Sequence, residues 1–447
     1  MSRSRKQPNP TTALTVIRPA GTQVANLEDL AGKARDYARN AISPRTQKEY
    51  ADHWRRYTGW CEQNNLKALP SHPGTLAAYV TWLADGQQGM GKRGTSWPEG
   101  HKVASSTLSV ILSAIKYYHR VAGESLKEML DKNEALREIL NGVRRSVAQT
   151  RTVRRVKPIT ARELRDILDM LRPKVAREAR DAALLAVGFG ACRRRSEVVT
   201  LDYMERTTGR GVLLIEDRGI VVKLMVSKTN QSGAEEEYVI ARTHAPRLCT
   251  AVENWITLAQ VQKGEAVFRG LHAGGNSERP QSGFKGVHWH DKGQENCEKP
   301  WVAVQRLPDG KREHFGYFKT PKEAHKVYCE RTGTDPHEAT GFRHLLGARM
   351  HSSLVAIIIK TRYANLLRAK IGKRKNLRPE EIDAIAAQVA DISGHSMRVG
   401  HITSAAEAGV PNHHIRLASG HKTDGMISVY TRITDKIGKS SLKGMGL

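Results

Sequence analysis

The sequence predicts a multidomain protein with an all-α N-terminal domain and a mainly α (α+β) C-terminal domain, which is interrupted by a small insert of three strands and one helix. Three observations lead to this prediction. A chain of 447 residues is long enough for two or three domains, each with its own core. Apolar residues recur at helical spacing over residues 26–147 and again from residue 159 onward. Residues 282–332 instead carry short β-prone segments separated by turn residues.

The charge of the chain favours a polyanionic partner. Lys and Arg number 72 against 45 Asp and Glu, a formal net charge of +27 at pH 7. Such an excess is typical of proteins that bind nucleic acid, and an anionic membrane surface is the alternative. We find neither a long apolar run nor a signal peptide, which disfavours a membrane-bound or secreted protein. The five cysteines form no C-x-x-C pair, which fits reduced thiols in the cytoplasm.

The N-terminal region divides into a tail, a helical domain and a linker. Residues 1–25 are basic and rich in Pro and Thr, and we predict a disordered tail that either contacts phosphates or is merely solvated. Ser43 and Pro44 are typical of a helix start. Residues 148–158 are a basic linker, which either follows a DNA backbone or is a solvated charge run. Apolar faces predict helices within 26–147 at these positions: Tyr50, Trp54, Tyr57 and Cys61; Leu76, Tyr79, Val80 and Leu83; Leu108, Ile111, Leu112, Ile115 and Tyr118; Leu136, Ile139, Leu140 and Val143.

The C-terminal domain, residues 159–447, is predicted from capping signals and β-branched runs. Thr160 and Glu163 have the spacing of a capping box. We predict the following elements in chain order: helices from Thr160 and over 181–188; strands over 212–215, 220–226 and 237–241; helices over 341–371 and from Arg378.

The insert, residues 282–332, contains its own strand, turn and helix signals. Strands are predicted over 286–290, 301–306 and 313–318, with a turn at Pro308–Gly310. Thr320 and Glu323 form a capping box with Pro321 in the first turn, so a helix should follow. A zinc site is a further alternative, although the spacing is not that of a known zinc finger. Its ligands would be His288, His290, Cys297 and Cys329.

Residues able to bind and attack a phosphate gather between Ser393 and Arg432. His395 and Arg398 form a His-x-x-Arg pair, His421 lies in Gly-His-Lys, and Tyr430 follows. Arginine donates two hydrogen bonds in a geometry that fits two phosphate oxygens. Histidine donates hydrogen bonds or moves protons near neutral pH, and a phenolate is a nucleophile. Each residue alone is more often a surface or core residue, so the ordered set carries the prediction. His401, His413 and His414 lie nearby and are predicted on DNA-facing or solvent-facing helix surfaces.

This ordered set resembles the C-terminal signature of the tyrosine recombinases, the phage-integrase family. Arg194-Arg-Ser-Glu197 resembles the first box of that family, although Arg193 and Arg195 leave the assignment open by one position. Cys192 stands where the family usually has Gly. Lys228, in a Ser-Lys-Thr turn between two predicted strands, resembles the lysine of the family's β-hairpin.

The resemblance implies a site-specific DNA recombinase or integrase of a phage or mobile element that works through a 3′-phosphotyrosine. Tyr430 would be the nucleophile, and Arg194 and Arg398 would neutralise the phosphate. Lys228 would protonate the leaving 5′ oxygen, His395 would help to deprotonate the tyrosine, and His421 would steady the phosphoryl group. The reaction would need no cofactor, neither metal nor ATP. The alternatives are a topoisomerase-like or resolvase activity from the same chemistry, and a catalytically impaired DNA-binding regulator.

The resemblance also implies partners and a location. Residues 26–147 would be the core-binding domain that closes over double-stranded DNA. The family acts as a homotetramer on two DNA sites, with an accessory or directionality factor in some systems. A cytoplasmic, nucleoid-associated protein without a membrane partner is expected.

The insert resembles a different family, the ethylene-response-factor (APETALA-two type) DNA-binding domains. The resemblance rests on Gly286-Val287, Trp301-x-Ala303, Phe315–Phe318 and the helix with Glu323, Ala324 and Tyr328. That family reads the major groove with one face of its sheet. An insert that only adheres to the DNA backbone is the alternative. The DNA-binding residues would be Lys285, His288, His290, Arg306, Arg312 and His314.

Overall fold

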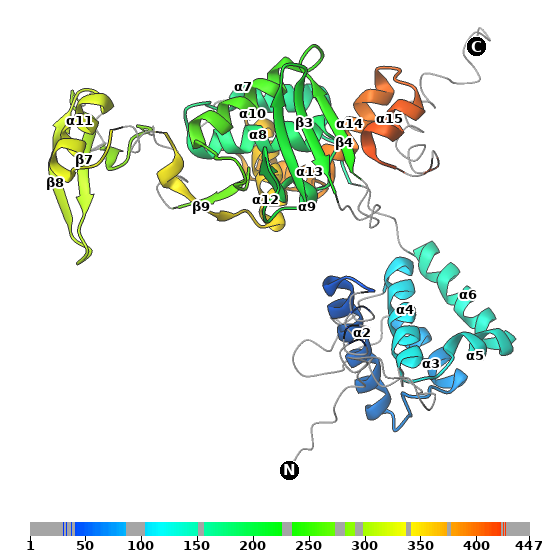
Figure 1. The fold of residues 1–447 in the computed structure, drawn as a ribbon. Coiled ribbons are helices and arrows are strands. Elements are labelled where there is room, and N and C mark those ends of the chain that lie inside the picture. Colours follow the sequence, from blue (N-terminus) through cyan, green and yellow to red (C-terminus); the bar gives the residue numbers. More distant parts are fainter. Residues whose placement is uncertain are drawn as a thin grey trace, which may run out of the picture. The chain divides into compact units, whose positions relative to one another are not determined.

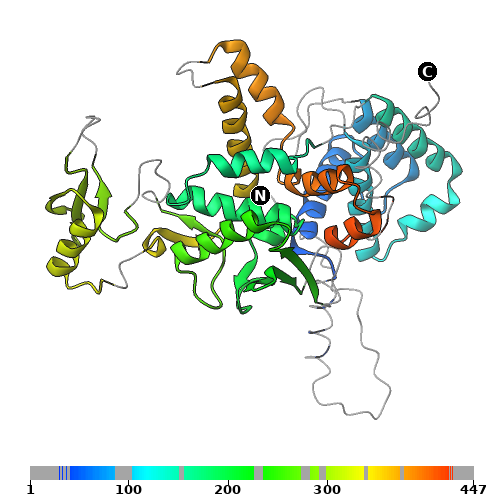
Figure 2. The ribbon, with the colours of Figure 1, turned by 90° about the horizontal axis from the view of Figure 1, so that it is seen from above.

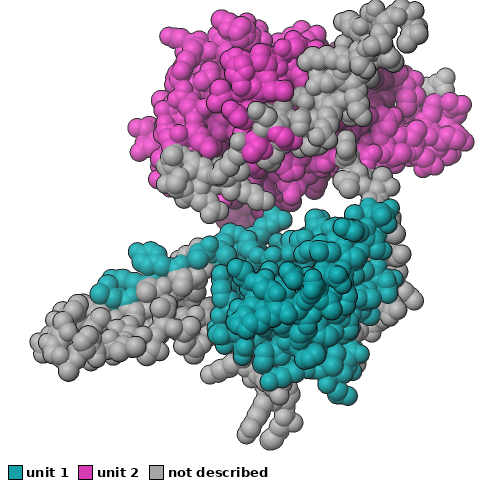
Figure 3. Space-filling view, turned by 90° about the vertical axis from the view of Figure 1, so that its right-hand side faces the viewer, with its two compact units in different colours: residues 1–153 teal, residues 154–447 magenta. Residues whose placement is uncertain are grey.

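The computed structural model is a mixed α/β protein that divides into two compact units, residues 1–153 and 154–447 (Figure 3). No helix in the described part of the chain is long and apolar enough to cross a membrane. The predicted N-terminal tail lies outside the described residues. The structure describes residues 41–85, 103–150, 156–225, 235–272, 282–290, 298–336, 341–372 and 377–421, with Leu30, Lys33, Tyr37, Thr423 and Gly425.

The described part of the first unit is helical, and aromatic side chains fill its core. Ser43 caps the first helix by accepting a hydrogen bond from the Thr46 amide at 3.2 Å. Trp54 stacks on Tyr118 with ring centroids 4.8 Å apart. Ile139, predicted as core, is 41% exposed, because the neighbouring Leu136 and Leu140 already turn toward the core. The helices are α2 (Pro44–Gln63), α3 (Pro73–Asp85), α4 (Ser105–Val121), α5 (Leu126–Lys132), which was not predicted, and α6 (Glu134–Thr150).

The second unit begins with helices packed on a small sheet (Figure 1). The predicted capping box of α7 (Ala161–Met170) is present, with both hydrogen bonds between Thr160 and Glu163. The sheet has the order β1-β2-β3-β4; β1 is parallel to β2, and the other pairs are antiparallel. Helix α10 packs on α8, β3 and β4. The remaining bounds are α8 (Ala176–Gly190), α9 (Arg195–Val198), β1 (Leu201–Tyr203), β2 (Gly211–Glu216), β3 (Gly219–Leu224), β4 (Glu236–Ala241) and α10 (Pro246–Ala259).

A buried ion network joins the helices of this unit. Asp181 of α8 accepts hydrogen bonds from Arg180, at 2.8 and 3.1 Å, and from Arg362 of α12 (Ser352–Ile371), at 2.7 and 2.9 Å. All three residues are buried, and the carboxylate of Asp181 accepts hydrogen bonds from both guanidinium groups, which compensates their charge. Helices α12 and α13 (Pro379–Ala390) then run side by side, in gold and orange in Figure 2.

The segment before α12 differs from the prediction of one helix over 341–371. It forms a 3₁₀ turn, η2 (Arg343–Leu345), and strand β9 (Leu346–Arg349), which pairs antiparallel with β5 (Arg269–Leu271). Because the partner strand is distant in sequence, local periodicity could not reveal this pairing. Helices α14 (Ser396–Glu407) and α15 (Asn412–Ser419) follow α13.

Strands β5 and β9 form the stem from which the insert leaves the second unit. Leu271 pairs with Leu346, and the His272 amide donates to the Leu345 carbonyl at 2.9 Å. Arg343 binds both carboxylate oxygens of Glu265 at 2.9 Å. Both ends of the insert are therefore held together by the unit itself.

The insert has the predicted three-stranded sheet and helix (Figure 1). Helix α11 (Pro321–Thr332) starts with the predicted Thr320–Glu323 capping box. A small core of its own joins sheet and helix, made by Val287, Trp301, Ala303, Ala324, Tyr328 and Cys329. Gly286 is required here, since its φ is +74° and a Cβ would lie 2.0 Å from the Tyr328 ring. The strands are β6 (Val287–Trp289), β7 (Trp301–Arg306) and β8 (Arg312–Phe318), in that order in the sheet.

Candidate active site

The turn between α8 and α9 presents the first predicted catalytic arginine. Cys192 has a φ of +53°, in the left-handed region that favours glycine. Arg194 is the N-cap of α9, and its amide donates to Glu197 Oε2 at 3.0 Å. Its Nη1 donates to Glu197 Oε1 at 2.7 Å, and Glu197 is buried. Glu197 therefore fixes both the backbone and the side chain of Arg194.

The structure gives the three consecutive arginines different environments. Arg193 is 2% exposed, and its guanidinium lies 3.3 Å from the ring centroid of Tyr238 on β4. Arg195 packs against Gly394, where a Cβ would lie 2.4 Å from its Cδ. Arg194 is held by Glu197, and its charge acts on both His395 and Arg398, whereas Arg195 acts on His395 and Arg193 acts on Arg398. This arrangement favours Arg194 among the three.

Helix α14 brings His395 and Arg398 to this turn. His395 is the N-cap and lies at the surface, whereas Arg398, one turn later, is 4% exposed. Arg398 Nη1 donates to the Cys192 carbonyl at 3.1 Å. Partial burial lowers the pKa of His395, and the charges of Arg398 and Arg194 lower it further. His395 is therefore a neutral base near pH 7.

His421 follows directly after α15 and completes the cluster. Gly420, with a φ of +65°, ends the helix and turns the chain, and a Cβ there would lie 2.9 Å from the Tyr238 hydroxyl. His421 Nε2 is 3.3 Å from Arg398 Nη2, and its Nδ1 is 2.7 Å from Ser419 Oγ. Burial, with the charges of Arg398, Arg194 and Arg193, lowers the pKa of His421 to about 4.

The cluster is a cationic site with neutral hydrogen-bond partners. Among the described residues, Arg398 bonds to a carbonyl and an imidazole, and Glu197 is engaged by Arg194. Burial lowers the pKa of Arg398, and the charge of Arg194 contributes. A buried cation is costly unless an anion compensates it. The arrangement is therefore suited to an anion with several oxygen acceptors, such as a phosphate.

Two predicted catalytic residues, Lys228 and Tyr430, lie outside the described residues. Strands β3 and β4 flank the segment that carries Lys228, and both belong to the sheet that contributes Tyr238. Sequence reasoning named Arg193 only as an alternative to Arg194, and it missed Ser419. The run of three arginines was a signal for the first, whereas nothing in the local pattern around Ser419 indicates a contact with His421.

The predicted DNA-binding residues fall mainly on one face of the insert. Trp301 and Ala303 pack in the core under α11, so Val302, Val304 and Arg306 lie on the opposite face. The strand register pairs His288 with Val302, His314 with Val304, and Arg312 with Arg306. His288, Arg306, Arg312 and His314 therefore share the face opposite the helix, while Lys285 and His290 flank β6.

Two of the described ligands of the zinc alternative lie on different faces of the insert. Cys329 packs in the core on the helix side and contacts His325 with its Sγ at 3.6 Å, whereas His288 lies on the other face. Cys297 lies outside the described residues. Within the described part of the chain, no three or more His, Cys, Asp or Glu side chains are grouped so that they could hold a metal ion.

The three other histidines predicted near the cluster differ in their surroundings. His401 was predicted on a helix surface, but its ring packs edge-on against Phe189 at 5.5 Å, and burial lowers its pKa. His413 and His414 are exposed, as predicted.

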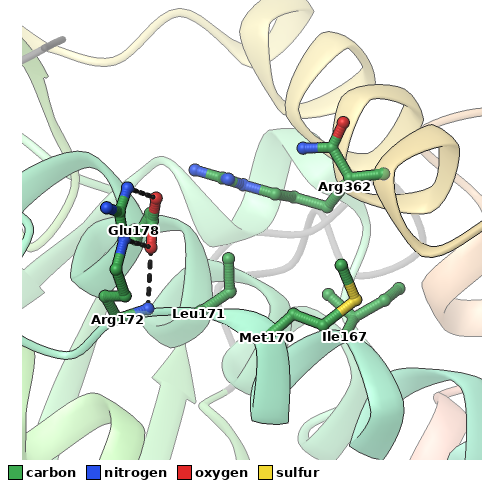
Figure 4. Close-up of a pocket in the computed structure, with 7 residues that line it drawn as sticks. Ile167, Met170, Leu171, Arg172, Glu178 and Arg362 are labelled. Atoms are coloured by element: carbon green, nitrogen blue, oxygen red, sulfur yellow. Dashed lines mark hydrogen bonds and ion pairs between the residues drawn. The ribbon is translucent and has the colours of Figure 1, made fainter. Parts of the chain in front are cut away.

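A cavity of about 220 Å³ lies between α7, α8 and α12 and contains none of the predicted site residues (Figure 4). Its lining consists of Ile167, Met170, Leu171, Arg172, Glu178, Arg362 and Asn365.

The chain is similar in sequence to an integrase/recombinase. No protein-family model matches it. Over 250 residues it is 27% identical to the integrase/recombinase XerD homolog of Selenomonas ruminantium; the match covers 55% of this chain and 65% of that relative, less than two thirds of its length.

Solved structures of recombinases also resemble the chain. The Tn1549 transposon integrase in complex with transposon right end DNA has 12% identity and a TM-score of 0.41, covering 92% of this chain and 98% of that chain. The XerH site-specific recombinase bound to difH substrate has 10% identity and a TM-score of 0.32, covering 83% and 76%. With TM-scores this low, the likeness rests on the sequence match.

Proposed function

We propose that this protein is a tyrosine-type site-specific DNA recombinase or integrase that cleaves and rejoins DNA strands. The observation that carries the proposal is the buried Arg398, whose hydrogen-bond partners among the described residues are neutral, converging with Arg194, His395 and His421. The sequence similarity to the XerD homolog supports the same function.

In the proposed reaction, the Tyr430 oxygen attacks a DNA phosphorus, and the bond from phosphorus to the 5′ oxygen breaks. Arg194 and Arg398 neutralise the non-bridging oxygens as negative charge develops on them. Neutral His395 takes up the phenol proton, and Lys228 gives a proton to the leaving 5′ oxygen. The 3′-phosphotyrosine conserves the energy of the broken bond. Attack by the 5′ hydroxyl of another strand then reverses the step and releases Tyr430, so rejoining needs no energy from ATP.

The wider setting is part of the proposal. The helical region 26–147 would act as the core-binding domain on double-stranded DNA. Assembly as a homotetramer on two DNA sites, with an accessory factor, and an origin in a phage or other mobile element follow from the resemblance to the recombinases. A cytoplasmic, nucleoid-associated location fits a DNA substrate. The net charge of +27 supports a polyanionic partner.

The insert is proposed as an additional DNA-binding module of the ethylene-response-factor type. The face with His288, Arg306, Arg312 and His314 lies opposite the packed helix and presents cationic and hydrogen-bonding groups to a groove. Arg306 and Arg312 are both exposed and face each other across the β7–β8 pair. A backbone-only contact would use the same charges without base selectivity.

A covalent-capture experiment tests the recombinase function. Nicked duplexes cut from the DNA that flanks the gene trap the enzyme, because a short cleaved strand diffuses away before religation. We expect a denaturant-resistant protein–DNA adduct from the wild type and none from Tyr430→Phe. Tyr203→Phe, at the end of β1 and outside both the insert and the anion site, is the matched control and should still form the adduct.

Three outcomes separate the candidate functions. Binding without any adduct would favour a catalytically impaired DNA-binding regulator. An adduct that relaxes supercoiled DNA without exchanging strands between two duplexes would favour a topoisomerase-like enzyme. Recombinant products from two duplexes would support the recombinase.

A further inference from the structure

The hydrogen bonds around His421 define its tautomer. A guanidinium has only donors, so Arg398 Nη2, 3.3 Å away, requires a lone pair on Nε2. The proton of the neutral ring is therefore on Nδ1, which donates to Ser419 Oγ at 2.7 Å. The hydroxyl in turn donates to the Arg416 carbonyl at 3.3 Å. Each donor in this relay meets an acceptor.

The end of α15 that carries Ser419 is anchored from outside the helix. Ser419 is fully buried. Arg193 Nη2 donates to the adjacent Ala418 carbonyl at 2.7 Å, while its Nε donates to the Ala191 carbonyl at 2.6 Å. The same guanidinium stacks on Tyr238 of β4. One buried arginine thus joins the α8–α9 turn, the sheet and the end of α15.

We infer that Ser419 is a positioning residue, which holds His421 as the Nδ1–H tautomer with Nε2 directed toward Arg398 and the anion site. This inference rests on the proposed function for its catalytic meaning. His421 then acts as a hydrogen-bond acceptor that orients the Arg398 guanidinium toward the phosphate, instead of donating to the phosphoryl group itself. The Ser419 hydroxyl also fixes the ring orientation, because a 180° flip would exchange Nδ1 with Cδ2 and Nε2 with Cε1 and would break both hydrogen bonds.

The charges that face His421 keep it neutral during this role. They are Arg398 on α14 and Arg193 and Arg194 at the α8–α9 turn, and together with burial they lower its pKa to about 4. Glu236 on β4 is engaged by the Tyr238 hydroxyl at 2.9 Å. A neutral ring has one donor and one acceptor nitrogen, so the tautomer decides which atom meets Arg398.

The test is direct observation of the tautomer in the full-length protein. Nitrogen NMR on protein labelled with ¹⁵N-histidine distinguishes the two ring nitrogens, and the His421→Gln variant identifies the signals of His421. In Ser419→Ala the ratio of Nδ1–H to Nε2–H should fall by about fivefold, the change expected for one net hydrogen bond. Ser419→Cys keeps a weaker partner and should give an intermediate ratio. Ser404→Ala is the matched control, because that hydroxyl accepts from the Ala161 amide instead and should leave the ratio unchanged.

An unchanged ratio in Ser419→Ala would overturn the inference, whether or not the protein forms a DNA adduct. The adduct rate on nicked DNA is the second measurement. It should also fall by about fivefold in Ser419→Ala and remain unchanged in Ser404→Ala. If the wild type forms no adduct, the proposed function fails, and the tautomer measurement still decides the role of the Ser419 hydroxyl. A shifted tautomer with an unchanged adduct rate would overturn the catalytic part of the inference.

Discussion

Removal of the insert should leave the second unit folded, because the stem and not the insert closes this part of the chain. A deletion of Gly283–Thr332 takes away β6, β7, β8 and α11 with the whole core that they share. It retains the pairing of Leu271 with Leu346 and the bidentate contact of Arg343 with Glu265. We therefore expect the free energy of unfolding of the second unit to change by less than about 1 kcal/mol. The entropic cost of closing the connection between β5 and β9 depends only weakly on its length.

A substitution at Phe342, which the deletion retains, should affect the stability of the second unit much more. Phe342, just beyond the insert, is 2% exposed, and its amide donates to the Leu258 carbonyl in α10. Truncation of a buried phenylalanine costs about 3–5 kcal/mol. Phe342→Ala should therefore destabilise the unit far more than the deletion of the entire insert does. Tyr317→Ala, an exposed aromatic residue of the insert, is the control and should have little effect.

Hydrogen exchange followed by mass spectrometry is the suitable assay, because it reports on α8 and α10 separately from the first unit. The deletion should preserve slow exchange in both helices, and Phe342→Ala should accelerate it. The deletion should also weaken DNA binding and make it less sensitive to salt, because each phosphate that the insert neutralises adds about 0.9 to the slope of log affinity against log salt concentration. Rapid exchange of α8 and α10 in the deletion variant would refute this reasoning and make the insert a structural part of the unit.

Three other predictions follow from individual contacts. Asp181→Ala should destabilise the second unit by about 3–5 kcal/mol in urea unfolding, because it leaves Arg180 and Arg362 buried without their carboxylate, whereas Asp169→Ala, at an exposed pair, should cost under about 1 kcal/mol. Cys192→Val should cost about 1–3 kcal/mol, measured in the same way, because a β-branched side chain does not tolerate a φ of +53°; an unchanged stability would argue against the turn geometry. The folded-state pKa of His421 is about 4 against an ordinary value of 6.5, so the unfolded chain binds the proton first as the pH falls. The contribution of His421 to the free energy of unfolding should be complete above about pH 6.5 and should decrease toward pH 4. His421→Gln should flatten this part of the profile of stability against pH.

Local signals predicted the elements that depend on local structure. The Thr160–Glu163 and Thr320–Glu323 capping boxes are both present, because each is satisfied within one helical turn. The strands of the insert were also predicted, since their alternation and turns lie close together in sequence. Strand β9 was missed, because its partner β5 is separated from it by the entire insert. The helix predicted from 341 consequently began too early.

The candidate site was predictable to the level of residue types, and the structure adds the contacts among them. The ordered motif identified Arg194, His395, Arg398 and His421, which the fold brings together. Arg193, unlike Arg194, stacks on Tyr238 of β4 and donates to the Ala418 carbonyl of α15. No spacing rule contains that information, because it arises from packing between distant segments. Lys228, Tyr430 and the DNA-reading role of the insert remain predictions.

The measurement that tests the central claim most directly is the chemical identity of the covalent link. After capture on nicked DNA, trypsin should release the peptide Thr423–Arg432, bounded by Lys422 and Arg432, which contains Tyr430 as its sole tyrosine. Mass spectrometry should find this peptide joined to a nucleotide through a 3′-phosphate on Tyr430, with a free 5′ hydroxyl on the other strand end. A nucleotide on another residue, or a 5′-phosphate linkage, would contradict the proposed mechanism.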